Sequence, residues 1–380
     1  MIVYINDISA FLPNEPVDNE KMEEIVGKIH NLPSRIKKRI LNNNKINTRY
    51  YAIDPATGNL THTNAQLAAA AIRKLSPYDG FSISEIECLC CGTTIADVIA
   101  PGHGLMVHGE LKIPPCEVVS TSGICLSGIS ALKYAFLNVD AGLCNNAVAV
   151  ASELASSVIR SNFFEHLDYS KQIEKSPILA FESDFLRWML SDAAGAVFLS
   201  REKNKNKISL KIDWIDHISY AGQYDVCMYA GAVKNEDGTI TGWRQLSSLA
   251  EAMEKNYFSI KQDTGLLNEE IVRVSVNLAL QRTIEKRKLK AEEIDWFVPH
   301  YSSDYFRDKL YAAMEGIGFV IPYGKWFSNL ADKGNTGSAS IYVMLEELFH
   351  SGKLQSGQKI LCFIPESGRF SIGYMLLTVV

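Results

Sequence analysis

The sequence predicts a mixed α/β fold that contains two copies of one structural unit. Strand-like and helix-like segments alternate along all 380 residues, which is typical of α/β proteins. Several strand-like runs, such as residues 145–153 (NNAVAVASE), lack polar alternation and therefore suit a sheet covered on both faces. Residues 123–153 and 334–367 also share one plan. Each has a turn of small residues, a helix, a link containing glycine, an apolar strand, and then a serine and a glutamate.

The first half is predicted to begin with a strand and to end at a charged turn. We expect strands at residues 1–13, 86–94, 114–122, 145–153 and 190–200, and helices at residues 64–75 and 125–139. The helix at 64–75 follows from apolar residues with a 3.6-residue period. Residues 156–188 are polar, and we interpret them as an excursion from the sheet that carries substrate-pocket or subunit-contact residues. The turn at 201–207 (REKNKNK) divides the chain into domains 1–205 and 206–380.

The second half is predicted to restart the same alternation. We expect strands at residues 208–219, 293–300, 358–368 and 370–380, and helices at residues 266–289 and 334–354. The segments DAAGAVFL and SIGYMLLTV then occupy matching last-strand positions in the two halves. The shared order of these elements is what indicates a duplication, because no single likeness is strong enough to do so.

Composition and charge exclude several classes of function. The formal net charge of −5 disfavours a protein that binds nucleic acid by bulk electrostatics. The N-terminal residues MIVYINDISA do not form a basic start followed by a long apolar run, and no apolar run approaches the ~20 residues that span a bilayer. We therefore expect a cytoplasmic protein with neither a membrane nor a nucleic-acid partner.

Eight cysteines raise the questions of metal binding and of nucleophilic catalysis. The CLCC run at residues 88–91 lacks a second Cys/His pair at ligand spacing and lies in an apolar run, so we expect a buried strand there and no metal site. Cys125 differs from the others because it follows a predicted strand and begins a predicted helix. The first-turn N–H groups would stabilise a thiolate and lower the pKa from ~8.5. Taken alone, Cys125 is better explained as a small buried apolar residue than as a nucleophile.

Two further residues occupy comparable junctions. His300 ends the run WFVPH, at the carboxyl end of a predicted strand, where open α/β sheets bind ligands. Asn335 lies in the turn KGNTGSAS before a helix. Considered singly, His300 is more simply interpreted as a packing residue, and Asn335 as a helix-capping residue. Together, a cysteine with two hydrogen-bond donors suits thioester chemistry: acyl transfer to sulfur, followed by stabilisation of an enolate.

Motifs along nearly the whole chain resemble the thiolase-fold condensing enzymes, specifically the beta-ketoacyl-acyl-carrier-protein synthase III group. The resembling segments follow in the family order: KINTRYYA (45–52), CGTTIADVIAP (91–101), GICLSG (123–128), SDAAGAVFL (191–199), WFVPH (296–300), GNTGSAS (334–340) and ESGRFSIGY (366–374). The resemblance implies a thiolase-like fold in which two duplicated βαβαβαββ halves form a five-layer αβαβα sandwich. It also implies an acyltransferase that works as a homodimer.

The resemblance assigns roles to individual residues. Cys125 would accept the acyl group, and His300 and Asn335 would polarise the second thioester and stabilise its carbanion or enolate. The N–H groups of Cys125 and Gly368 would form the oxyanion hole. The substrates would arrive as acyl-CoA or on an acyl carrier protein, with no further cofactor. Other candidates are the pocket residues Thr93, Tyr301, Ser303 and Arg369, and the carrier-docking residues Arg35, Lys37, Lys38, Arg39 and Arg307.

The chain also departs from the usual family pattern. HYSS replaces His-Gln-Ala-Asn, SGR replaces the triple-glycine loop, and the chain is longer than a typical member, mainly at residues 156–188 and 220–265. These changes imply an unusual substrate. Segments 61–72, 106–112, 185–196, 337–348 and 365–371 look most similar to the ketosynthases of dialkylresorcinol and flexirubin-type biosynthesis, which are understood to join two acyl thioesters, at least one of them a beta-keto thioester, and then close a six-membered ring.

Three alternatives remain open from the sequence. A housekeeping fatty-acid initiation synthase would condense a short acyl-CoA with a malonyl carrier. A non-catalytic partner subunit of a ketosynthase pair would usually have lost one of Cys125, His300 and Asn335, all of which are present. A cysteine hydrolase can have the same Cys, His and Asn order, but the papain-type Cys-Gly-x-Cys-Trp signature is missing.

Overall fold

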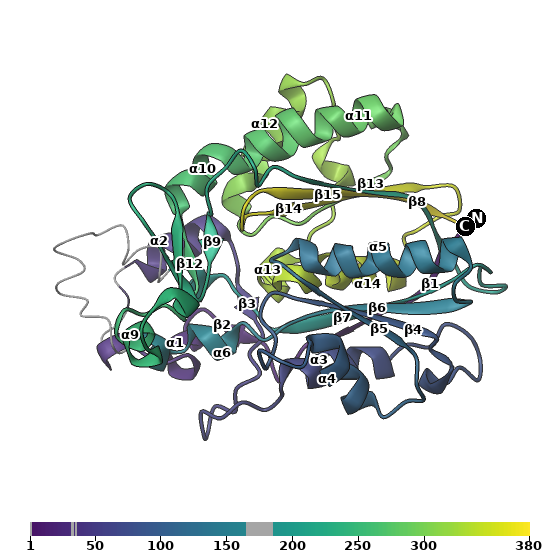
Figure 1. Ribbon diagram of the computed structural model, residues 1–380. Helices are drawn as coiled ribbons and strands as arrows, with labels where there is room; N and C mark the ends of the chain where they lie inside the picture. The colour runs from purple at the N-terminus through teal and green to yellow at the C-terminus, as the bar shows by residue number, and fades with distance from the viewer. Residues whose placement is uncertain (1, 32–33, 35, 165–184) are drawn as a thin grey trace.

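Two sheets and three layers of helices alternate through the molecule (Figure 1). The computed structural model describes residues 2–31, 34, 36–164 and 185–380. The first sheet has the order β5-β4-β6-β7-β1 and the second has the order β13-β14-β15-β8. They meet where β1 pairs with β8 through Tyr4–Lys211 and Ile5–Leu210, so the nine strands form one hydrogen-bonded series. The predicted five-layer thiolase-like architecture is therefore confirmed.

The strands of the two sheets occur in the predicted order. In the first sheet they are β1 (Tyr4–Phe11), β4 (Cys88–Thr93), β5 (Glu117–Ser122), β6 (Asn146–Glu153) and β7 (Ala193–Ser200). In the second sheet they are β8 (Leu210–Ser219), β13 (Trp296–Pro299), β14 (Lys359–Glu366) and β15 (Ser371–Val379). Runs without polar alternation are buried on both faces, as in β4, all of whose residues are buried.

The helices form two outer layers and one central layer (Figure 1). The central layer consists of α5 (Leu126–Ala141) and α14 (Ser340–His350), with the short α13 (Leu330–Lys333) nearby. One outer layer contains α3 (Asn64–Arg73) and α4 (His103–Leu111). The other contains α10 (Thr264–Val272), the π-helical stretch η6 (Arg273–Leu280), α11 (Gln281–Arg287) and α12 (Arg307–Gly316). The long helix predicted at 266–289 therefore contains a π-helical centre.

Strand pairing repeats between the halves. β4 and β6 are parallel and β6 and β7 antiparallel, just as β13 and β14 are parallel and β14 and β15 antiparallel. The counterpart of β5 is reduced to a parallel bridge between Phe297 and Trp326. The described residues thus give the second sheet one strand fewer than the first, while the order of the remaining strands matches.

A close approach between the halves positions the junctions that carry the predicted site residues. A Cβ atom at Gly128, in the first turn of α5, would collide with the carbonyl oxygen of Ser338 at the start of the α14 region. The Tyr342 hydroxyl also donates to the carbonyl of Gly128 over 2.9 Å. Glycine at this point therefore permits the contact that brings the Cys125 turn beside the Asn335 turn.

The segments outside the two sheets comprise β2 (Val17–Asp18), β3 (Thr48–Arg49), α1 (Met22–Ile25), α2 (Lys37–Asn44), α6 (Ser156–Ile159), α9 (Leu249–Glu254), β9 (Met228–Tyr229), β10 (Ala232–Lys234), β11 (Ile240–Gly242) and β12 (Lys261–Gln262). Residues 165–184 of the predicted excursion lie outside the described residues. Within the described part of the chain, no helix is both long and apolar enough to cross a bilayer.

Candidate functional site

Cys125 is the N-cap residue of α5, directly after the turn that follows β5. The predicted strand-to-helix junction is therefore confirmed. The residue is 8% exposed and packs in the central core cluster, so its thiol is enclosed rather than presented at the surface. Leu126, the first residue of the helix, is also buried. Access to this sulfur must come through internal cavities.

Two cavities meet at Cys125. The main cavity has about 680 Å³ of space not filled by atoms and the side cavity about 460 Å³, and both values include open solvent at the cavity mouths. Cys125, Ser302 and Ser367 line both cavities, so they mark the junction. Asn335 lines the main cavity and His300 lines the side cavity, so each of them shares a cavity with Cys125.

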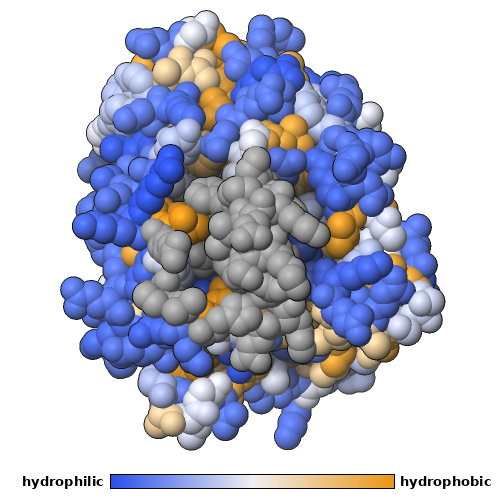
Figure 2. Space-filling view, turned by 90° about the vertical axis from the view of Figure 1, so that its left-hand side faces the viewer, coloured by the Kyte–Doolittle hydropathy of each residue, from blue (hydrophilic) through white to orange (hydrophobic). Residues whose placement is uncertain are grey.

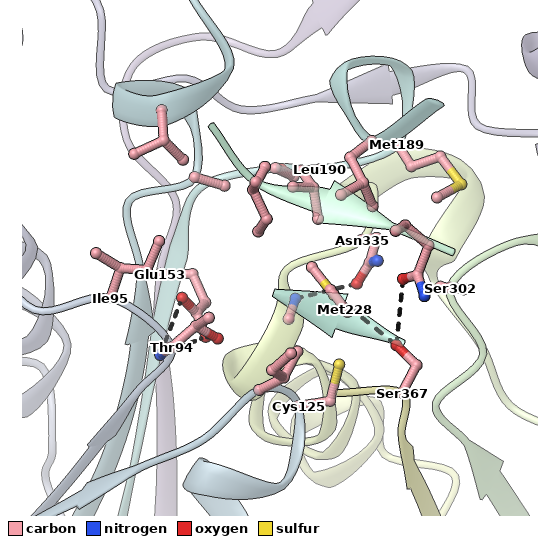
Figure 3. A pocket seen from close by; sticks show the side chains of 18 of the residues that line it. Thr94, Ile95, Cys125, Glu153, Met189, Leu190, Met228, Ser302, Asn335 and Ser367 are labelled. Carbon is pink, nitrogen blue, oxygen red and sulfur yellow. Dashed lines mark hydrogen bonds between the residues drawn. The ribbon is translucent and has the colours of Figure 1, made fainter. Parts of the chain in front are cut away.

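Backbone contacts fix Asn335 in the main cavity (Figure 3). Its N–H donates to the carbonyl of Met189 over 2.9 Å, and its carbonyl accepts from the N–H of Ser191 over 2.9 Å. Its Oδ1 accepts from the N–H of Gly337 over 3.1 Å. The side-chain oxygen is thus held by the turn, which orients the amide so that its NH₂ group can serve as the donor.

His300 follows β13 and is 3% exposed. Its backbone N–H donates to the carbonyl of Phe363 over 2.8 Å, which ties it to β14. Burial lowers the pKa of His300 to about 4. The imidazole is therefore neutral near pH 7, where it can donate a hydrogen bond but is a weak base.

The environment of the Cys125 thiol differs from our expectation. The sequence predicts a lowered pKa, but burial raises the pKa of the Cys125 thiol, and the nearby carboxyl groups of Glu366 and Glu153 add to the increase. The N-terminus of α5 was predicted to stabilise a thiolate. Burial of the thiol and the two nearby carboxyl groups raise its pKa by more than the helix N-terminus lowers it. Cys125 is thus a protonated thiol at rest.

The predicted second oxyanion donor is engaged elsewhere. The N–H of Gly368 donates to Oε1 of Glu366, and the same carboxylate accepts from the N–H of Ser371 over 3.1 Å. Gly368 also does not line either cavity that contains Cys125. The assignment of the Gly368 N–H to an oxyanion hole is therefore corrected, because the buried Glu366 side chain uses this donor to satisfy its own oxygen.

The pocket candidates are placed unevenly around the site. Tyr301 lines the side cavity, as predicted. Thr93 lies beneath the surface, where its hydroxyl accepts from Nδ2 of Asn64 over 2.8 Å, and Ser303 caps a short helical turn. Arg369 is exposed and donates to the carbonyl of Tyr224 over 2.9 Å. Thr94 and Ser302, one residue away in each case, line the main cavity instead of Thr93 and Ser303.

The basic candidates for carrier docking have different environments. Arg35 lies outside the described residues, and Lys37 pairs with Glu23 over 3.1 Å and lies over the ring of Trp188. Lys38 and Arg39 are exposed on α2, which packs against the short turn at Asp304–Phe306. Arg307 follows that turn and lies 4.4 Å from the ring centre of Tyr323. The basic residues of α2 and Arg307 are thus brought to the same region of the molecule.

The structure adds residues that the sequence motifs did not identify. Glu153 at the end of β6 and Ser367 line the main cavity, together with Ser302, which the HYSS departure already places beside His300 (Figure 3). Met228, Ile260 and Gln262 reach the same cavity from the region near 220–265, and Val158, Phe185 and Leu186 reach it from the described parts of the 156–188 excursion. These described residues of the excursion thus form part of the cavity wall, while its assignment to substrate-pocket or subunit contacts stays a prediction. The signal for Glu153 was its place in the duplicated pattern, where Glu366 is the counterpart.

The outer face beside these segments is largely polar, with scattered apolar side chains around the grey atoms (Figure 2). The described residues contain no group of three His, Cys, Asp or Glu side chains arranged to hold a metal ion. The eight cysteines are free thiols, and the Cys88–Cys91 run forms the buried strand β4, as predicted. The groups that line the two cavities include the Cys125 thiol, the neutral His300 imidazole, the Asn335 amide, the Ser302 and Ser367 hydroxyls and the buried Glu153 carboxyl group.

Comparison with known proteins points to one type of enzyme. Residues 284–377 match the family described as 3-Oxoacyl-[acyl-carrier-protein (ACP)] synthase III C terminal. The chain is 22% identical over 363 residues to Beta-ketoacyl-[acyl-carrier-protein] synthase III of Chlorobaculum tepidum, covering 94% of this chain and 93% of that protein.

Solved structures share the fold over the whole chain. The tetronic acid condensing enzyme AbyA1 superposes with a TM-score of 0.74 at 15% identity, covering 99% of each chain. A cysteine-to-serine variant of Xanthomonas campestris OleA, solved with bound lauric acid and lauroyl-CoA, superposes with a TM-score of 0.73 at 17% identity, covering 100% of this chain and 99% of that one.

Proposed function

We propose that this chain, a thiolase-fold condensing enzyme of the beta-ketoacyl-acyl-carrier-protein synthase III type, joins two acyl thioesters by Claisen-type carbon–carbon bond formation. One acyl group would be held on Cys125, and the second substrate would be a beta-ketoacyl thioester. The observation that carries the proposal is the meeting of two separate cavities at the Cys125 thiol. Two cavities at one nucleophile can hold an acyl chain and a second substrate at the same time.

The nature of the cavity walls supports two acyl substrates. The side cavity has an apolar wall of Leu267, Ile271, Val272, Phe306, Leu310 and Phe363. We assign it to the acyl chain carried by Cys125. The main cavity combines apolar walls with Asn335 and Glu153, and we assign it to the second thioester. OleA, which shares the fold, was solved with a fatty acid and an acyl-CoA bound.

In the first stage, the Cys125 sulfur attacks the carbonyl carbon of the acyl thioester. The bond to the leaving sulfur breaks, and the thiol proton of Cys125 ends on the released CoA or carrier thiol. The raised pKa of the Cys125 thiol means that the proton must leave as the new bond forms. The hydroxyl of Ser302, which lies at the junction, would donate to the developing oxyanion in place of the Gly368 N–H, whereas the Ser367 hydroxyl donates to Oε1 of Gln262 over 3.3 Å.

In the second stage, the enolate of the other thioester attacks the carbonyl carbon of acyl-Cys125. The amide of Asn335 and the neutral imidazole of His300 would donate hydrogen bonds to the enolate oxygen. The tetrahedral intermediate then collapses, and Cys125 leaves as the thiolate and regains a proton. The final product is a branched beta-dicarbonyl thioester, which is a suitable precursor for closure of a six-membered ring.

The more specific role, in dialkylresorcinol-type secondary lipid or pigment biosynthesis, rests on the sequence resemblance. It is tested by turnover of matched donors with a beta-ketoacyl thioester and with a malonyl carrier protein. We expect kcat/KM for the beta-ketoacyl thioester to be at least about tenfold higher than for the malonyl carrier protein, because differences in pocket contacts typically discriminate between substrates by about that factor. Preference for malonyl carrier protein would instead identify a housekeeping initiation synthase.

The side cavity should set the length of the acyl chain on Cys125. Ile271 is 8% exposed and lines this cavity, so Ile271→Trp would fill part of it. We expect kcat/KM for a long-chain donor to fall by about tenfold or more relative to a short-chain donor. Leu266→Trp, on the same helix but outside the cavity, is the matched control. Equal loss for both donor lengths would place the acyl chain elsewhere.

We also propose that the protein is a homodimer joined through β5. This strand is the last in the first sheet and pairs on only one side among the described strands. Apolar side chains on the helices that pack against it are exposed, including Leu105 (54%) and Leu137 (49%). A bare edge strand flanked by apolar surface favours pairing with another chain.

The dimer proposal predicts a change in mass when this surface is altered. Leu105→Asp combined with Leu137→Asp should convert a dimer into a monomer, because it places charges on the exposed apolar surface. Sedimentation velocity would measure the mass of both proteins. A monomeric wild-type protein at micromolar concentration would contradict the proposal.

A further inference from the structure

We propose that Glu153 is the base that removes the proton from C2 of the second thioester. This inference deepens the proposed function and rests on it, because it concerns how the enolate is generated. A beta-ketoacyl thioester has an acidic C–H between two carbonyl groups, so an enolate can form by deprotonation without loss of carbon dioxide. A positioned carboxylate is a suitable acceptor for such a proton.

The position of Glu153 fits this role. It is the last residue of β6 and lines the main cavity together with Cys125 and Asn335 (Figure 3). Glu153 as a whole residue is 6% exposed, so bulk water does not compete freely for its carboxyl group. A substrate between Asn335 and Glu153 would have its carbonyl oxygen near an amide donor and its C2 near a carboxyl oxygen. Both groups belong to the cavity that we assign to the second substrate.

The hydrogen bonds of Glu153 divide its two oxygens into different roles. Oε1 accepts from Oγ1 of Thr94 over 2.6 Å, from the N–H of Thr94 over 3.1 Å and from the N–H of Ser338 over 3.2 Å. Among the hydrogen bonds of the described residues, Oε2 has only a long contact of 3.3 Å with the same Thr94 N–H. One oxygen therefore anchors the carboxyl group, and the other keeps the capacity to take a proton.

The electrostatic surroundings give this carboxyl group a suitable basicity. No described ion pair joins Glu153 to a lysine, arginine or histidine. Burial raises the pKa of Glu153 to about 7, although the bonds from Thr94 and Ser338 oppose the increase. By contrast, burial lowers the pKa of His300 to about 4. The two pKa values are thus displaced in opposite directions. Glu153 is suited to act as the base, and His300 is suited to act as a neutral hydrogen-bond donor.

The proposed step balances in protons and electrons. The Glu153 carboxylate takes the C2 proton, and the C–H electron pair becomes the enolate held by Asn335 and His300. The enolate carbon forms a bond to the carbonyl carbon of acyl-Cys125, and the carbon–sulfur bond breaks. The released Cys125 thiolate then receives the proton from Glu153. The cycle ends with the carboxylate and the thiol restored, and it needs no oxidant, reductant or additional co-reactant.

A purely structural role must be distinguished, because Glu153 also links the end of β4 to the start of the α14 region. Glu153→Gln keeps an oxygen that can accept from Thr94 and Ser338 but cannot act as the base. The matched control is Asp192→Asn. Asp192 is also buried, with a pKa raised by burial to about 6, and it accepts from the N–H groups of Ala52 and Ser156, but it does not line either cavity.

The experiment measures exchange of the C2 protons of a 3-oxooctanoyl N-acetylcysteamine thioester in D₂O by mass spectrometry, without a second acyl donor. We expect wild-type protein to accelerate exchange above the buffer rate, Glu153→Gln to reduce the acceleration by about 100-fold, and Asp192→Asn to remain within about threefold. The wild-type rate should rise with pH up to about 7 and then level off, because only the deprotonated carboxylate accepts the proton.

Acylation of Cys125 is measured in parallel on the same proteins, by intact-protein mass. Glu153→Gln should still form the Cys125 adduct, since the first stage does not involve the C2 proton. Exchange that is equal in wild-type and Glu153→Gln protein, or absent from the wild type, would overturn the role of Glu153 while the adduct shows that the proposed function stands. Absence of the adduct from wild-type protein would instead remove the proposed function itself.

Discussion

Replacing Cys125 with alanine is expected to abolish condensation, with a loss of at least about a thousandfold in kcat/KM. The sulfur is the nucleophile at the junction of the two cavities, and alanine has no atom that can carry the acyl group. Product formation from two acyl thioesters, followed by liquid chromatography and mass spectrometry, measures the effect. The variant should fold, because removing one buried sulfur leaves only a small cavity.

The matched control for this variant is Cys144→Ala. Cys144 is 7% exposed, similar to Cys125 at 8%, but it lines neither of the two cavities. We expect its activity to stay within about twofold of wild type, since the reaction does not use its thiol. Full activity in Cys125→Ala, or equal losses in both variants, would show that the thiol at the junction is not the acyl carrier.

Replacing His300 or Asn335 with alanine is expected to separate the two stages of the reaction. Each substitution removes a donor to the enolate oxygen, so condensation should fall by about 100-fold to 1,000-fold. Acylation of Cys125 should continue at a similar rate, because it requires neither donor. Single-turnover measurements of adduct formation and of product release would report the two stages independently.

His103→Ala provides the control for the histidine substitution. His103 and His300 are both 3% exposed, and burial lowers the pKa of each to about 4. His103 instead contacts the Ser152 hydroxyl over 3.0 Å and lies outside both cavities. We expect its substitution to reduce stability and leave both stages intact. A block in acylation by His300→Ala would mean that the imidazole takes the thiol proton of Cys125.

The fold and the junctions were predictable because they depend on local patterns repeated in both halves. The apolar run of β6 and the small residues around Cys125 and Gly128 require nothing beyond the sequence to be interpreted. The repeated order of elements indicated two copies of one unit, in which Cys125 and Asn335 occupy comparable turns. The structure places them together, with Gly128 in contact with Ser338.

The electrostatics of the site could not be predicted, because they depend on side chains that converge from distant segments. A helix N-terminus alone favours a thiolate at Cys125, but Glu153 and Glu366 arrive from two other strands and raise the pKa of the thiol. Likewise, the Gly368 N–H is a plausible oxyanion donor until Glu366 is seen to accept its hydrogen bond. The predicted pocket residues Thr93 and Ser303 are each one position away from the residues that line the main cavity, Thr94 and Ser302. Neighbouring residues at strand ends point to different sides, so the sequence alone did not show which of the two faces the cavity.

The central claim is that Cys125 carries an acyl group, and intact-protein mass spectrometry tests it most directly. Wild-type protein would be incubated with acetyl, medium-chain and beta-ketoacyl thioesters in turn, and peptide mapping would locate any adduct. We predict a mass increase of one acyl group on Cys125 with at least one donor, and none in Cys125→Ala. A wild-type protein that gains no acyl group from any donor, or a Cys125→Ala protein that gains the same group, would contradict the account.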